Sequence, residues 1–229
     1  MNILVIHSHN ANRGDEAAVK AMVDELLIKY PGAKITISNN GFTPYPGMPE
    51  NVIQIDRFPK LESRIAQLEF FIVLLFKGKF ALTKEARKFI RALKEADVVL
   101  HAPGGPSIGD TYFKAEKLYL WRLNLIRRMG IPYIFYAPSM GPFNCASRNK
   151  LRKEVISGAE RIILRDPISV KYVKDFLPGV EVEQALDSAL QHDIDIDKNE
   201  RKYNNYPELK NFIENHEKCI GITITASST

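Results

Sequence analysis

Short apolar runs alternate with longer segments of helical periodicity along most of the chain. The runs have the length of strands buried on both faces, and they occupy residues 3–6, 34–38, 52–55, 98–100, 132–137, 161–164 and 180–184. The segments with an apolar helical face lie at residues 15–30, 83–95, 112–129, 147–157 and 167–176. This alternation predicts an α/β, Rossmann-like fold with a mainly parallel sheet and helices on both faces.

Residues with known capping preferences mark several helix ends. Thr83 is a favourable N-cap for the helix that follows it, and Pro167 suits the first turn of a helix. Gly130 is expected to end the helix before it. These signals place polar loops between the predicted elements.

Polar residues and glycines follow the predicted strands. After the strand that ends at Leu100 come His101, Gly104, Gly105, Ser107 and Asp110. A glycine pair lets a ligand approach the backbone, and its N–H groups are expected at the N-terminus of the next helix. Two further histidines, His7 and His9, follow the first strand in the same way. Ligands of open α/β sheets bind beyond the carboxyl ends of strands, so we expect the site there.

The first strand, the polar loop at residues 7–15 and the next helix have the order of a nucleotide-binding unit. The loop matches neither the dinucleotide fingerprint G-x-G-x-x-G nor the P-loop pattern G-x-x-x-x-G-K-[ST]. Asp15 and Glu16 in the first helical turn suit the positive end of the helix dipole. The loop therefore predicts a polar site without either phosphate-binding motif.

An apolar patch at residues 70–76 is followed by Lys77, Gly78 and Lys79. One interpretation is a buried helix or a contact between subunits within residues 61–80. The other is a hydrophobic surface that meets a membrane, with the lysines at the interface. The patch is far shorter than the roughly 20 residues that span a bilayer.

The 229-residue chain has a formal net charge of +5, and its basic residues are spread along it. No basic arm or RNA-binding motif is recognisable, so no nucleic-acid partner is predicted. Cys145 and Cys219 match no disulfide or metal framework, and the N-terminus lacks the pattern of a signal peptide. Asp193, Asp195 and Asp197 lack the glycine and glutamate of a calcium loop, so no metal site is predicted. We expect a cytoplasmic protein, peripheral at the inner membrane face if the apolar patch meets lipid.

The C-terminal part of the sequence predicts a change of domain. Residues 1–190 are expected to form the Rossmann-like domain, and the polar residues 191–206 a linker. Residues 207–229 predict a helix followed by a strand at 219–225. We interpret them as the start of a second, truncated domain.

Short motifs occur in one order along the chain: Asn12-Arg13-Gly14-Asp15 with Ala17, Gly104-Gly105 with Ser107 and Asp110, Ser139-Met140-Gly141-Pro142, Arg165-Asp166 with Ser169, and Leu186-Asp187-Ser188-Ala189. Together they resemble the polysaccharide pyruvyl transferase family, from about residue 2 to residue 225. Two positions depart from the family pattern, with Pro106 where a third glycine is usual and Ser188 where proline is common. The resemblance implies an enzyme that transfers a pyruvyl group from phosphoenolpyruvate to a sugar, usually as a ketal across two hydroxyls. It also implies a GT-B-like pair of domains with the active site between them, of which this chain holds the N-terminal half.

Three residues are candidates for catalysis. Arg165 offers a planar guanidinium to clamp an anion, although a salt bridge to Asp166 or a helix terminus would explain it equally well. Asp15 is a candidate base or acceptor for a sugar hydroxyl, or else compensates the helix dipole. His101 is a candidate general acid or base. The residues expected to bind substrate are Asn12, Gly14, Gly104, Gly105, Ser107, Asp110, Gly141, Asp166, Ser169 and Asp187.

The resemblance implies phosphoenolpyruvate as the donor substrate and no cofactor. The acceptor would be a saccharide of a cell-surface polysaccharide or of its lipid-linked precursor. Two alternatives stay open, a GT-B-type glycosyltransferase that uses a nucleotide sugar and a non-catalytic, truncated binding domain. The sequence also leaves homo-oligomerisation open.

Overall fold

The computed structural model describes residues 1–9, 12–40, 44–59, 64–191 and 196–220. The chain divides into two compact units, Met1–His192 and Asp193–Thr229. The second unit contains the short helices α7 (Ile196–Asn204) and α8 (Pro207–Glu214). The sheet and the candidate site belong to the first unit.

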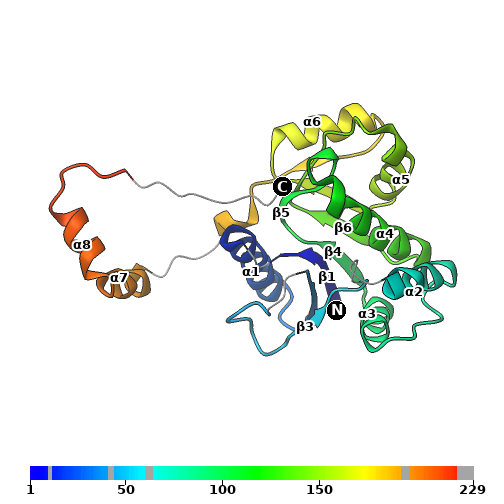
Figure 1. The fold of residues 1–229 in the computed structure, drawn as a ribbon, viewed down its shortest axis with the longest axis horizontal. Coiled ribbons are helices and arrows are strands. Elements are labelled where there is room, and N and C mark those ends of the chain that lie inside the picture. Colours follow the sequence, from blue (N-terminus) through cyan, green and yellow to red (C-terminus); the bar gives the residue numbers. More distant parts are fainter. Residues whose placement is uncertain (10–11, 41–43, 60–63, 192–195, 221–229) are drawn as a thin grey trace. The chain divides into compact units, whose positions relative to one another are not determined.

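A parallel sheet of seven strands forms the centre of the described part of the first unit (Figure 1). In spatial order the strands are β3 (Val52–Asp56), β2 (Lys34–Asn39), β1 (Asn2–Ser8), β4 (Val98–His101), β6 (Tyr133–Tyr136), β8 (Arg161–Leu164) and β9 (Glu183–Gln184). All neighbours pair in parallel. The chain moves outward from β1 to β3 and then crosses to β4 on the other side of β1. The predicted α/β, Rossmann-like fold is therefore confirmed, with the strand order reversing between β1 and β4.

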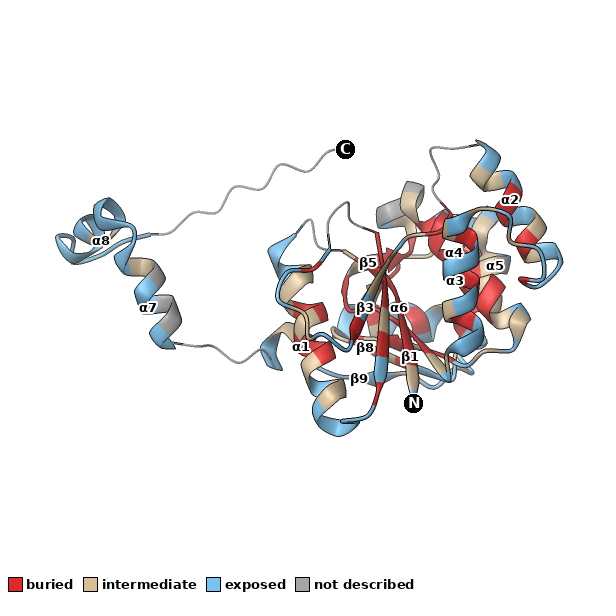
Figure 2. Cartoon of the chain, turned by 90° about the horizontal axis from the view of Figure 1, so that it is seen from below, coloured by how far each residue is buried: buried red, intermediate tan, exposed pale blue. Residues whose placement is uncertain are grey.

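Helices cover both faces of this sheet because the side chains of β1 alternate between two hydrophobic cores. Ile3 and Val5 pack with α1 (Arg13–Lys29) on one face, whereas Leu4 and Ile6 pack on the other. That second face is covered by α2 (Arg64–Leu75), α3 (Lys84–Glu95), α4 (Phe113–Met129), α5 (Ala146–Ser157) and α6 (Pro167–Phe176). Figure 2 shows the buried residues gathered between these helices and the sheet.

Helix ends follow the capping signals of the sequence. The Thr83 hydroxyl accepts a hydrogen bond from the N–H of Ala86 at 3.2 Å and caps α3. Pro167 lies in the first turn of α6, and Gly130 follows α4 with a φ of +74°. These three predictions are confirmed.

The glycine stretch after β4 forms a strand, which corrects the prediction that it leads directly into a helix. β5 (Gly104–Ile108) pairs in parallel with β7 (Pro138–Met140), and a 3₁₀ helix at Asp110–Tyr112 precedes α4. The N–H groups of Gly104 and Gly105 are therefore not at a helix N-terminus. The two backbones that follow β5 and β7 pack closely, because Gly109 has a φ of +142° and a Cβ there would lie 2.6 Å from the carbonyl oxygen of Gly141.

Two strand boundaries also differ from the prediction. Strand β1 continues to Ser8, so His7 lies in the sheet and not in the loop after it. Strand β9 is shorter than residues 180–184, because the N–H of Val180 turns back to the carbonyl of Leu177 at 3.0 Å. The sequence pattern cannot separate a strand from an extended turn of similar residues.

The C-terminal segment contains more helix than predicted. Residues 191–206, expected as a linker, include α7, which is built largely of charged residues with good helix propensity. The helix predicted next is confirmed as α8. Cys219 and Ile220 lie in no strand. The rest of the predicted strand, together with Asp193 and Asp195, lies outside the described residues.

Candidate functional site

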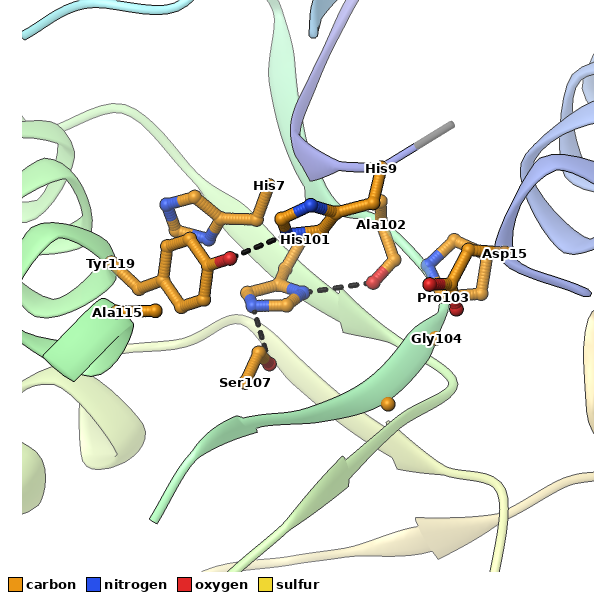
Figure 3. A pocket seen from close by; sticks show the side chains of 11 residues that line it. His7, His9, Asp15, His101, Ala102, Pro103, Gly104, Ser107, Ala115 and Tyr119 are labelled. Atoms are coloured by element: carbon orange, nitrogen blue, oxygen red, sulfur yellow. Dashed lines mark hydrogen bonds between the residues drawn. The ribbon is translucent and has the colours of Figure 1, made fainter. Parts of the chain in front are cut away.

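A pocket of about 180 Å³ opens at the carboxyl ends of β1 and β4, where the strand order reverses. Open α/β sheets bind ligands at this position, because the helices that follow the two neighbouring strands lie on opposite faces of the sheet and leave a crevice between their loops. The pocket is lined by His7, His9, Asp15, His101, Ala102, Pro103, Gly104, Gly105, Ser107, Ala115 and Tyr119. Figure 3 shows the histidines and Tyr119 gathered on one side of it, and Asp15 beside Gly104 on the other. The structure thus brings together the predicted residues Asp15, His101, Gly104, Gly105 and Ser107.

His101 is a buried imidazole that accepts a hydrogen bond from Ser107 (Figure 3). Its Nδ1 lies 2.9 Å from the carbonyl oxygen of Ala102, which can only accept, so Nδ1 carries the proton. Nε2 is then the acceptor for the Ser107 hydroxyl, whose Oγ lies 2.9 Å away. Burial lowers the pKa of His101 to about 4. At neutral pH this imidazole is therefore uncharged, and its Nε2 can accept a proton but has none to donate.

His9 accepts hydrogen bonds from α4 and from the end of β2. Its Nε2 lies 2.5 Å from the Tyr119 hydroxyl and 3.5 Å from Nδ2 of Asn40. An amide nitrogen only donates, so Nε2 is the acceptor and the Tyr119 proton points toward it. Burial lowers the pKa of His9, whereas the nearby Asp15 raises it. Sequence reasoning missed Tyr119, because a buried tyrosine on an apolar helix face looks like a core residue. It also missed Asn40, which the sequence placed in an ordinary polar loop.

His7 is buried in a conformation that costs stability. Its φ is 62°, in the left-handed region that residues with a side chain rarely adopt. The ring centroid lies 4.7 Å from that of His101 and 4.3 Å from that of Tyr119. Neither ring nitrogen has a hydrogen-bond partner among the described residues, and burial lowers the pKa of His7 well below its ordinary value. Unused polar groups and backbone strain at one buried position are typical of functional sites.

Asp15 stands in the first turn of α1 and faces the start of β5. A Cβ at Gly104, where φ is +141°, would lie 2.9 Å from the Oδ1 of Asp15, so only glycine fits. The N–H of Gly105 donates a hydrogen bond to the carboxylate. Burial raises the pKa of Asp15, although His9, Arg165 and this N–H lower it. Asp15 is therefore a stronger base than an ordinary aspartate.

A second polar cluster is built from Ser139 of β7 and from residues that follow β8 and β9. Arg165 donates from Nε to the Ser139 hydroxyl at 2.9 Å and forms an ion pair with Asp187. Asp166 instead caps α6, and accepts from the N–H and the hydroxyl of Ser169 at 2.7 Å each. Burial alone would raise the pKa of Asp166, but these hydrogen bonds and one from Ser139 lower it. The partner of Arg165 is thus Asp187, which corrects the alternative of a salt bridge to Asp166.

The cluster and the pocket lie along the same edge of the sheet. Arg165 lowers the pKa of Asp15 and Asp187 raises it, so both charges act on the pocket. The side chains of Arg165 and Asp187 are 26% and 30% exposed. The ion pair is therefore accessible to a charged ligand that enters beside the pocket.

Asp110 lies in a buried ionic network rather than in the pocket. Its carboxylate accepts from Arg152 at 2.7 Å and from the N–H groups of Asn144 and Cys145 at 2.6 and 3.2 Å. Burial alone would raise the pKa of Asp110, but these contacts lower it. The fully buried Glu116 of α4 binds the same guanidinium at 2.7 Å. This network ties the segment after β5 to α4 and α5, and the sequence contained no signal for it.

The remaining predicted residues shape the surroundings of the pocket without lining it. The Asn12 side chain caps α1 and accepts from the N–H of Gly14 at 2.8 Å. Gly141 has a φ of +89°, and a Cβ there would lie 2.7 Å from the side chain of Tyr172 on α6. Gly14 therefore supplies an N–H to the helix cap, and Gly141 serves local backbone geometry.

Fold and site together define a Rossmann-like α/β protein with a polar pocket at the switch point of its sheet. Within the described part of the chain, no group of three or more His, Cys, Asp or Glu residues is arranged to hold a metal ion. The family model described as polysaccharide pyruvyl transferase matches residues 12–223, and the chain belongs to that family. The membership predicted from the short motifs is confirmed. No curated protein shows a significant match to the chain.

Proposed function

We propose that the protein transfers a pyruvyl group from phosphoenolpyruvate to a saccharide of a cell-surface polysaccharide or of its lipid-linked precursor. Family membership supports a transferase. The observation that carries the proposal is the position of Asp15, a carboxyl of raised pKa that lines the pocket and is coupled to the charge of Arg165. Joining an anionic donor to a hydroxyl calls for a cation and a proton-transfer group side by side.

The proposed reaction balances without a further reactant. A proton adds to the methylene carbon of phosphoenolpyruvate, and a sugar hydroxyl oxygen bonds to the adjacent carbon. A second hydroxyl oxygen then bonds to the same carbon, and the bond between this carbon and the phosphate oxygen breaks. One hydroxyl proton replaces the proton taken up by the methyl group, and the other leaves with inorganic phosphate. The products are the pyruvate ketal and phosphate.

Each candidate residue has a place in this scheme. The guanidinium of Arg165, oriented by Ser139 and Asp187, is proposed to hold the carboxylate or phosphate of the donor. Asp15 is proposed to take the proton of the attacking hydroxyl. His101, acting through the Ser107 hydroxyl, is proposed as the second base.

Calorimetric titration with phosphoenolpyruvate tests the donor site. We expect Arg165→Ala to weaken binding by at least about tenfold, because a charge-assisted bidentate contact to the anion is lost. Arg161→Ala is the matched control, since Arg161 begins β8, the strand that Arg165 follows, and its exposed side chain pairs with Glu183 at 2.6 Å. It should leave binding unchanged.

Asp15→Asn separates binding from chemistry. This variant should bind phosphoenolpyruvate at least as tightly as the wild type, because a negative charge near the donor is removed. It should release no phosphate when saccharide acceptors are added. Absence of phosphoenolpyruvate binding, or binding indifferent to Arg165, would contradict the proposal. Preferential binding of a nucleotide sugar would favour a glycosyltransferase instead.

A further inference from the structure

Helix α2 is apolar on both of its sides. Phe70 and Val73 face the core and are fully buried. On the other side, Ile65, Leu68 and Leu75 are 76%, 63% and 64% exposed. A helix at the surface of a globular protein normally carries polar residues on its outer side. The outer side of α2 is instead suited to an apolar environment.

Aromatic residues extend this surface. The ring of Phe71 lies 5.0 Å from that of Trp121 on α4, and the ring of Phe76 lies 4.9 Å from that of Phe80. Phe71, Phe76 and Phe80 are exposed. The whole patch, which we name the α2 surface, consists of Ile65, Leu68, Phe71, Leu75, Phe76, Phe80, Leu82 and Trp121.

Cations border the α2 surface. Lys77 and Lys79 are exposed in the turn that follows α2. The Nζ of Lys117 lies 4.6 Å from the centre of the Trp121 ring. Long side chains of this kind place an ammonium group in water while their methylene groups cover apolar area.

Glu69 keeps negative charge away from the α2 surface. It is the only acidic residue between positions 64 and 82, all of which the structure describes, and it is 4% exposed. Its carboxylate accepts from the backbone N–H groups of Leu82 and Thr83 at 2.7 Å each and from the Thr83 hydroxyl at 2.8 Å. These bonds attach α2 to the start of α3, so the apolar side chains are presented on a fixed element.

We propose that the α2 surface docks on an anionic lipid bilayer, with its apolar side chains at the acyl boundary and its lysines among the headgroups. No helix of the described chain is long and apolar enough to cross a membrane. The 12 residues of α2 extend about 18 Å, which suits a helix that lies in the interface. Lysine is depleted in protein–protein interfaces but attracted to anionic lipids, which favours lipid over a protein partner. This proposal does not depend on the reaction proposed above.

Trp121 makes docking measurable because it is the only tryptophan of the chain. The full chain is mixed with vesicles of phosphatidylcholine containing phosphatidylglycerol, and separately with vesicles of phosphatidylcholine alone. We expect co-sedimentation with the anionic vesicles and a blue shift of the fluorescence. We also expect quenching by lipids spin-labelled near the headgroup and weaker binding at high salt.

Paired substitutions locate the contact. Leu75→Ser with Phe76→Ser should weaken vesicle binding by more than about tenfold, since two inserted apolar side chains are lost. Lys77→Gln with Lys79→Gln should weaken binding to anionic vesicles by about tenfold. Ile28→Ser is the control, because Ile28 is 72% exposed on α1, which covers the opposite face of the sheet. Circular dichroism should show that all variants remain folded.

Three outcomes would overturn the proposal. They are failure of the wild type to sediment with anionic vesicles, equal binding by the α2 variants, and equal loss in the Ile28→Ser control. A concentration-dependent dimer that Leu75→Ser with Phe76→Ser abolishes, without any vesicle binding, would assign the surface to a second copy of the chain.

Discussion

Burial moves the proton affinities of the pocket's residues toward one another. It lowers the pKa values of His7, His9 and His101 and raises that of Asp15. The shifts leave the three imidazoles uncharged at neutral pH and make Asp15 a stronger base than an ordinary aspartate. The exclusion of water from the pocket is the main cause of both changes.

His7→Phe is expected to stabilise the protein. The phenyl ring retains the contacts with His101 and Tyr119, and it removes two buried nitrogens that lack partners among the described residues. The free energy of unfolding in urea should rise by roughly 1–2 kcal/mol. The same change at the exposed His216 should shift it by less than about 0.5 kcal/mol. A loss of stability in His7→Phe would show that the imidazole supports the fold.

At the scale of elements, buried charges join the segment after β5 to α4 and α5. The Glu116 carboxylate accepts from the N–H of Gly109 at 2.8 Å, from Arg148 at 2.8 Å and from Arg152 at 2.7 Å. Glu116 and Arg152 are both inaccessible to solvent. These contacts hold the end of β5, and therefore one wall of the pocket, against the helical layer.

Glu116→Gln should lower the free energy of unfolding by about 1.5–3 kcal/mol, because the buried Arg152 loses one of its two carboxylate partners and keeps only Asp110. Urea denaturation measures the loss. The double variant Glu116→Leu with Arg152→Leu should be more stable than Glu116→Leu alone, because the buried guanidinium is removed together with its partner. Glu154→Gln is the control, since its pair with Arg127 is partly exposed and should contribute less than about 1 kcal/mol. Equal effects at both positions would contradict this account.

The positions of most strands along the chain could be predicted from the sequence, whereas the pairing of β5 with β7 could not. Buried parallel strands such as β4 and β8 appear as continuous apolar runs. Strand β5 contains two glycines and a proline, residues that weaken a strand assignment. Its pairing of Gly104 with Pro138 depends on β6 bringing a distant segment alongside.

On the scale of the whole molecule, the buried histidines make stability depend on pH. His101 has a pKa of about 4 in the folded chain and about 6.5 when unfolded. Between these values the unfolded chain binds a proton that the folded chain does not. Stability is therefore complete above pH 6.5 and falls as the pH drops toward 4. His7 and His9 act in the same direction, since their pKa values are also lowered.

His101→Asn should reduce this dependence, because the amide does not titrate. The difference in unfolding free energy between pH 7 and pH 4.5 should shrink by about 2–3 kcal/mol relative to the wild type. Chemical denaturation at a series of pH values measures it, and the comparison cancels the carboxylates that both proteins share. An unchanged dependence of the unfolding free energy on pH would mean that folding does not lower the pKa of His101.

The sequence by itself determined the alternation of most strands and helices, the mainly parallel sheet and the edge of the sheet at which the candidate site lies. It could do so because apolar periodicity and capping are local, and because the carboxyl ends of parallel strands share one edge. The motif residues Asp15 and Gly104 were predictable for the same reason. Only the tertiary structure decided that Arg165 pairs with Asp187, that Tyr119 reaches His9 and that His7 has no partner among the described residues. These features depend on packing between distant segments, which sets both the contacts and the exclusion of water that shifts the pKa values.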